Sequence, residues 1–206
     1  MYKILTKEML TPTICRMKVE APRLAASAQP GQFLIVRADE KGERIPLTIS
    51  DYDKNEGSVT IVTQQIGAST SEICSYEVGD CFADVVGPLG IPSDFTEMSA
   101  DELAGKKYDQ AVAIGPMIMM KFATLTCKKL ELPVIVSLNT LMVDGTGMCG
   151  ACRVTVGGKV RFACVEGPEF DGYLVDFDEA MRRQRMYNTE ERDANEHHVC
   201  RIGRGK

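Results

Sequence analysis

Three cysteines in the last third of the chain constrain its fold more than any other feature. Cys149, Cys152 and Cys164 follow the spacing C-x2-C-x11-C, and Asp144 stands five positions before the first. The first two lie in a glycine-rich turn, and a short hairpin would return the third beside them. Plant-type [2Fe–2S] proteins place a fourth cysteine where Asp144 stands. The segment therefore predicts a metal centre, and a [2Fe–2S] cluster held by these four residues is the favoured occupant.

A structural zinc site is the alternative at this position, because three cysteines and one carboxylate can also bind zinc. Structural zinc sites usually have four Cys or His ligands, which favours iron here. Four other cysteines are scattered through apolar patterns, where small buried hydrophobic residues are expected. They are Cys15, Cys74, Cys81 and Cys127.

The overall composition is that of an ordinary globular chain. Among 206 residues, 44% are hydrophobic and 26% are charged, and the net charge of −5 argues against a nucleic-acid surface. No apolar run is long enough to span a bilayer, and the first twenty residues lack the apolar core of a signal peptide. We therefore expect a cytoplasmic protein without a membrane span.

Residues 1 to about 90 predict a small antiparallel β-barrel, because short apolar alternations recur between turn signals. The expected strands are Thr13–Val19, Phe33–Val36, Leu47–Ser50, Ser58–Thr63 and Cys81–Val86. One helix is expected to interrupt them, capped within Ser69–Ser71 and with its body at Glu72–Tyr76.

A polar linker, residues 91 to about 108, precedes a change of pattern. Gln110–Ile114 and Pro133–Leu138 are continuous apolar strands, and Met117–Leu130 between them reads as a helix. This order predicts a βαβ unit with parallel strands. Two parallel strands are too few to bury both faces, so we expect another surface to cover them: the barrel, the cluster-binding lobe, a second copy of the chain or a different subunit.

The C-terminal part predicts a hairpin and a charged helix. Cys152–Val156 and Val160–Cys164 are the hairpin strands, joined by Gly157-Gly158, and the helix spans Asp176 to about Asn195. The predicted fold class is β plus α/β. Its parts are a Greek-key barrel (1–92), a truncated α/β unit (93–140) and a metal-binding hairpin segment with a helix (141–206).

Two motifs in the barrel suggest a nucleotide cofactor. Arg44-Ile-Pro-Leu-Thr-Ile-Ser50 offers a guanidinium for a phosphate and the Thr48 hydroxyl for a flat heterocycle, while Gly67-Ala-Ser-Thr70 opens a helix suited to a diphosphate. Each motif alone also fits a surface arginine or an ordinary helix cap. Their order, followed by Gly87-Pro-Leu-Gly90, favours the cofactor.

These motifs together resemble the ferredoxin–NADP reductase superfamily. Within it, the sequence is most similar to electron-transfer subunits of dihydroorotate dehydrogenase and small subunits of NADH-dependent ferredoxin:NADP oxidoreductase. The similar segments are Pro30–Phe33, Arg44–Ser50, Gly87–Gly90, Ala113–Pro116, Met142–Cys152 and Phe162–Phe170.

The resemblance implies FAD on the barrel and a [2Fe–2S] cluster at the cysteines. The FAD contacts that it implies are Arg44, Pro46, Leu47, Thr48, Val62, Thr63, Gln64, Gly67, Ser69 and Thr70. Arg44 stands one place further from the hydroxyl residue than the superfamily pattern expects. At Asp144 the dehydrogenase branch has a cysteine and the ferredoxin:NADP branch an aspartate, so the second branch matches better.

The resemblance also implies the function of an electron-transfer subunit. FAD and the cluster would pass electrons to a larger flavin and iron–sulfur subunit, with ferredoxin or another redox protein as a further partner. No side chain is expected to act as a nucleophile or general acid. The alternatives are a non-catalytic flavin- or cluster-bearing assembly module and the structural zinc protein.

The family's nucleotide-binding domain is expected to be incomplete in this chain. Twenty residues separate Gly90 from Ala111, and they contain one glycine, so the glycine-rich turn that binds nicotinamide nucleotides is missing. We therefore do not expect this chain to oxidise NAD(P)H directly.

Overall fold

The computed structural model describes residues 2–93 and 108–196. These residues form two compact units. The first contains the residues up to Leu89, the short segment Met142–Gly145 and the residues from Tyr187 on, and the second contains Gly90–Leu141 and Thr146–Met186. Most of the predicted linker lies outside the described residues. None of the described helices is long and apolar enough to cross a bilayer.

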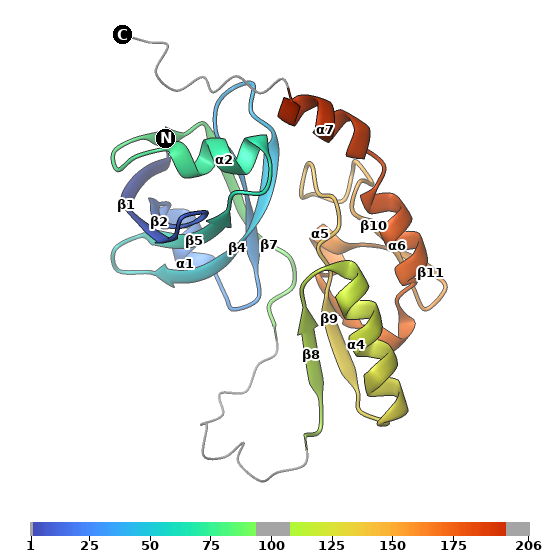
Figure 1. The fold of residues 1–206 in the computed structure, drawn as a ribbon. Coiled ribbons are helices and arrows are strands. Elements are labelled where there is room, and N and C mark those ends of the chain that lie inside the picture. The colour runs from blue at the N-terminus through green and yellow to red at the C-terminus, as the bar shows by residue number, and fades with distance from the viewer. Residues whose placement is uncertain (1, 94–107, 197–206) are drawn as a thin grey trace. The chain divides into compact units, whose positions relative to one another are not determined.

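A seven-stranded antiparallel sheet forms the first unit (Figure 1). Its strands are β1 (Tyr2–Thr11), β2 (Ile14–Glu20), β3 (Phe33–Arg37), β4 (Arg44–Asp53), β5 (Ser58–Gln64), β6 (Cys81–Phe82) and β7 (Asp84–Leu89). They pair in the order β6-β1-β2-β5-β4-β3-β7. Because β6 and β7 lie at opposite edges but only Ala83 separates them in sequence, the sheet curls into a nearly closed barrel. The predicted antiparallel barrel is confirmed.

Alternating side chains fill the barrel. On β2, Cys15, Met17 and Val19 are at most 1% exposed, whereas the intervening residues lie on the outer side. Phe82 and Ile61, both at most 1% exposed, join the same core. This period of two is the pattern from which the strands were predicted.

The helices of the barrel differ from the prediction of a single helix. α1 (Pro22–Ser27) was not predicted, although Pro22 at its first turn is a helix-start signal. α2 (Ala68–Ser75) begins earlier than expected, with Gly67 as its N-cap. The predicted cap within Ser69–Ser71 is therefore wrong, because these residues already belong to the helix.

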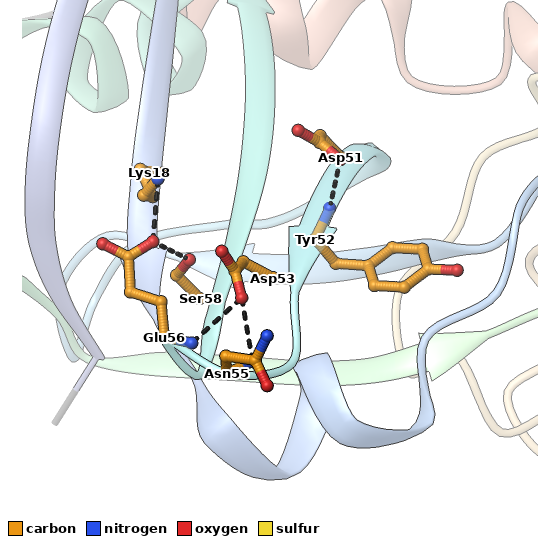
Figure 2. A network of polar contacts seen from close by, with 7 residues as sticks. All are labelled: Lys18, Asp51, Tyr52, Asp53, Asn55, Glu56 and Ser58. Carbon is orange, nitrogen blue, oxygen red and sulfur yellow. Dashed lines mark hydrogen bonds and ion pairs between the residues drawn. The ribbon is translucent and has the colours of Figure 1, made fainter.

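A polar network closes the β4–β5 hairpin (Figure 2). The Asp53 carboxylate accepts hydrogen bonds from the backbone N–H groups of Asn55 (2.8 Å) and Glu56 (3.0 Å). These donors hold the pKa of the Asp53 carboxyl below its ordinary value. The Glu56 carboxylate accepts from Lys18 and from the Ser58 hydroxyl, each at 2.8 Å. The network thereby fixes the ends of the two strands that carry the predicted FAD residues.

The second unit contains the predicted βαβ unit. β8 (Ala111–Ile114) and β9 (Val134–Ser137) are parallel, with α4 (Met117–Lys129) between them, so this prediction is confirmed. β12 (Glu169–Asp171) pairs antiparallel with β9. The core of the unit includes Met120 and Val136, both fully buried.

The hairpin of β10 (Arg153–Val156) and β11 (Lys159–Phe162) follows the cysteine turn and forms as predicted. Cys164 lies in α5 (Ala163–Glu166) rather than at a strand end, which corrects the expected position. The 3-10 helix η1 spans Gly172–Leu174.

The predicted charged helix is divided into α6 (Phe177–Gln184) and α7 (Asn188–Glu196). α6 buries Phe177 and Ala180 in the second unit. The sequence of α7, NTEERDANE, has no large apolar side chain with which to continue that packing. The expectation of one continuous helix is therefore wrong.

Candidate functional site

β4 divides its predicted site residues between two faces. Leu47 packs against the barrel core and Ile49 is 6% exposed within it. Because side chains alternate along a strand, Arg44, Pro46 and Thr48 share the opposite, outer face. Thr48 is exposed, and the other two are half-buried. Leu47 can therefore offer a ligand on this face only its backbone groups.

β5 continues the outer face. Ile61 is buried and pairs with Ile49 of β4, so the residues on either side of it point outward. Val62 is 39% exposed and Gln64 is exposed, whereas Thr63 is 1% exposed and lies on the inner face. The structure thus brings Val62 and Gln64 to the face that carries Thr48, and it turns the Thr63 side chain into the barrel.

Arg44 is held in place by an ion pair. Its Nη2 lies 3.4 Å from Oδ2 of Asp84 on β7, and both side chains are about one third exposed. Its buried Nε has no hydrogen-bond partner among the described residues. The guanidinium is therefore oriented on the outer face and retains donor capacity.

The start of α2 is closed by Thr70. Its Oγ1 accepts from the backbone N–H groups of Ile66 and Gly67, both at 3.0 Å, and donates to the Gly67 carbonyl at 3.1 Å. The Ser69 hydroxyl is hydrogen-bonded to the Glu43 carboxylate. The three predicted residues Gly67, Ser69 and Thr70 thus lie together at a helix N-terminus, but both hydroxyls are engaged within the protein.

Two of the predicted metal ligands meet in the second unit. The sulfur atoms of Cys152 and Cys164 are 3.2 Å apart, and these residues are 1% and 2% exposed. Cys149 is exposed, and its sulfur accepts a hydrogen bond from the backbone N–H of Ala151 at 3.5 Å. The hairpin β10–β11 causes the approach, since it returns α5 to the cysteine turn.

The cysteine turn requires glycine on both sides of Cys149. Gly150 has a φ of +68°, a conformation that other residues adopt only at a cost. Gly147 has a φ of +78°, and a Cβ added there would lie 3.0 Å from the Val165 side chain.

Asp144 belongs to the segment that groups with the barrel unit. Among the described residues, no three His, Cys, Asp or Glu side chains are assembled as a metal site.

Sequence reasoning missed Arg183, which contacts the cysteine turn. Its Nη2 donates to the carbonyl oxygens of Gly150 and Ala151, at 3.2 and 3.3 Å. In the sequence, Arg183 is one of several arginines near the end of a charged helix, and no local signal distinguishes it.

The donor set suits a thiolate-bound iron–sulfur cluster. Two buried sulfurs already lie side by side, and a backbone N–H points at the third sulfur, as is usual around cluster thiolates. Cluster binding then requires the Cys149 side chain to join the pair, which a turn containing glycines at positive φ permits.

Comparison with known proteins identifies the part of the chain that contains the three cysteines. Residues 139–176 match the family model of the iron–sulfur cluster binding domain of dihydroorotate dehydrogenase B. An uncharacterized protein from the adh 3′ region of Clostridium beijerinckii is 44% identical, with 93% of this chain and 92% of that protein covered. A Thermotoga maritima homologue of the dihydroorotate dehydrogenase B electron-transfer subunit is 34% identical, with 98% and 96% covered.

Both alignments extend over 272 positions, whereas this chain has 206 residues. The relatives therefore have residues at positions where this chain has none. Among solved structures, that of the NADH-dependent reduced ferredoxin-NADP oxidoreductase superimposes with a TM-score of 0.86 at 33% identity. The superposition covers 95% of this chain and 97% of the chain in that structure.

The Thermotoga maritima relative is similar enough, and covered fully enough, to show the family of this chain. The protein is an oxidoreductase subunit that transfers electrons, and the family's cofactors are a flavin and an iron–sulfur cluster. Neither the assembly module nor the structural zinc protein is favoured. The chain belongs to the family of dihydroorotate dehydrogenase B electron-transfer subunits.

Proposed function

We propose that this chain holds FAD on the outer face of β4 and β5 and a [2Fe–2S] cluster at its cysteine turn, and that it relays electrons to a larger redox subunit. The observation that carries the proposal is the buried pair of Cys152 and Cys164, which lies inside the segment matching an iron–sulfur binding domain. The flavin supplies two-electron chemistry when bound, and the cluster accepts and releases single electrons.

The protein's own residues position the flavin. Thr48, Val62 and Gln64 form an exposed surface against which a flat ring can lie, and Arg44 is oriented beside it by Asp84. The N-terminus of α2 is suited to the diphosphate, because a helix N-terminus presents positive potential. Bringing an anion there requires Ser69 to exchange its bond with the Glu43 carboxylate for one with the ligand.

The fourth cluster ligand in this proposal is Asp144. Its support is the sequence spacing to Cys149 and the resemblance to the branch that has aspartate at this position. A carboxylate is a harder donor than a thiolate, so this ligand sets the cluster apart from those with four cysteines.

The proposal assigns oxidation of NAD(P)H to another polypeptide. Its support is that the sequence between Gly90 and Ala111 contains no glycine-rich turn. The larger subunit would then supply or receive the electrons. The cytoplasm is the proposed location, because that compartment keeps thiols reduced and cluster ligands must be reduced.

Substitution of one cluster cysteine tests the proposal. We expect Cys152→Ala to lose iron and sulfide and the cluster absorption while the flavin absorption stays, because alanine offers no donor atom and the two sites lie on different elements. Cys127→Ala, on α4 of the same unit, is the matched control and should retain both cofactors. Unchanged iron and sulfide in Cys152→Ala would refute the ligand assignment.

A further inference from the structure

Arg183 hydrogen-bonds to the peptide group that faces a cluster ligand. Its Nη2 donates to the Gly150 carbonyl oxygen at 3.2 Å. The N–H of that same peptide unit belongs to Ala151 and donates to the Cys149 sulfur at 3.5 Å. The guanidinium, the peptide and the sulfur thus form one chain of hydrogen bonds.

The packing of α6 explains why this arginine and not its neighbours reaches the turn. Ala180 is 2% exposed in the core of the second unit, and Arg183 lies one turn further along the same face of the helix. Arg182 and Arg185 lie off this face and are exposed, whereas Arg183 is half-buried. The start of α6 is anchored by the Asp176 N–H, which donates to the Thr155 carbonyl of β10 at 2.9 Å.

The contact has two physical consequences for the turn. A charged donor on a carbonyl oxygen polarises its peptide group, which strengthens the hydrogen bond that the peptide's N–H donates. The second bond, to the Ala151 carbonyl at 3.3 Å, holds the next peptide as well. Gly150 has a φ of +68°, and a glycine leaves the backbone conformationally free, so the two bonds from Arg183 restrict the turn.

We propose that Arg183 is a positioning residue that raises the reduction potential of the cluster through the Gly150–Ala151 peptide. The inference rests on the proposed cluster at Cys149, Cys152 and Cys164. Hydrogen bonds to ligand sulfurs and nearby positive charge both stabilise the reduced, more negative cluster. A half-buried charge acts more strongly than one in water, because water screens the exposed charge.

Redox titration of variants separates this role from a structural one. In Arg183→Gln the cluster potential should become more negative, because both the charge and the fork of donors are lost. In Arg183→Lys the shift should have the same sign and be smaller, because the charge remains. Arg185→Gln removes an exposed charge near the same end of α6 and should match the wild type.

Iron and sulfide content and far-ultraviolet circular dichroism are measured on the same samples. Equal potentials in the wild type and both Arg183 variants would overturn the inference, as would equal shifts in Arg183→Gln and Arg185→Gln. If Arg183→Gln loses the cluster, the potential of Arg183→Lys is the test: a more negative potential than the wild type supports the inference, and an equal potential overturns it. Loss from both variants would make Arg183 a structural residue only.

A wild-type protein without iron and sulfide would refute the proposed cluster, and this inference with it. That result is distinct from a cluster-containing protein whose reduction potential is the same with and without Arg183, which would leave the proposed function intact.

Discussion

Cys152 and Cys164 stand twelve positions apart in the sequence, yet their sulfurs are 3.2 Å apart. The sequence predicted this approach, because Gly157-Gly158 signals a tight hairpin. In the structure both glycines adopt positive φ. The contact of Arg183 with the turn was not predictable, because it depends on which face of α6 packs on β10. Tertiary packing determines this face, and nothing in the sequence near Arg183 distinguishes it from the neighbouring arginines.

Asp144→Cys tests the remaining ligand. A thiolate shares more charge with iron than a carboxylate does, so we expect the cluster to be retained and its potential to become more negative. Asp144→Ala, which offers no donor atom, should lower the iron content. The measurement is a redox titration with iron analysis, and an unchanged potential in Asp144→Cys would exclude Asp144 as a ligand.

Secondary-structure elements decide how much of the flavin surface the sequence could indicate. The period of two along β4 and β5 places Arg44, Pro46 and Thr48 on the outer face and Leu47 on the inner one. A resemblance transfers whole motifs and therefore did not distinguish these faces. α2 begins earlier than expected because Gly67 is its N-cap, and the Thr70 hydroxyl accepts hydrogen bonds from the N–H groups of Ile66 and Gly67.

Thr70→Ala should destabilise α2. The hydroxyl accepts from two backbone N–H groups, and loss of an intramolecular hydrogen bond costs about 1 kcal/mol. Thr70→Ser keeps the hydroxyl and should stay close to the wild type. Urea unfolding of the two variants measures the difference, and equal stability of Thr70→Ala and Thr70→Ser would show that the cap contributes nothing.

At the scale of the whole molecule, the three-stranded sheet of the second unit has apolar side chains exposed on one face of β8. Ala111 and Ala113 of β8 pack on its core, whereas Val112 and Ile114, on the other face, are 44% and 65% exposed. The sequence predicted that another surface covers these strands, since a two-stranded parallel sheet cannot bury both faces, and this face of β8 is exposed among the described residues. It did not predict β12, whose three residues are too few to show a strand pattern.

The central proposal is that this chain carries a flavin and a [2Fe–2S] cluster and that another polypeptide oxidises NADH. The visible absorption spectrum of anaerobically purified protein, recorded before and after addition of NADH, tests it most directly. We predict flavin and cluster bands, with matching iron and sulfide, that NADH leaves unchanged. A colourless, zinc-containing protein would contradict the cofactor assignment. Prompt bleaching of the flavin by NADH would contradict the proposal that another polypeptide oxidises NADH.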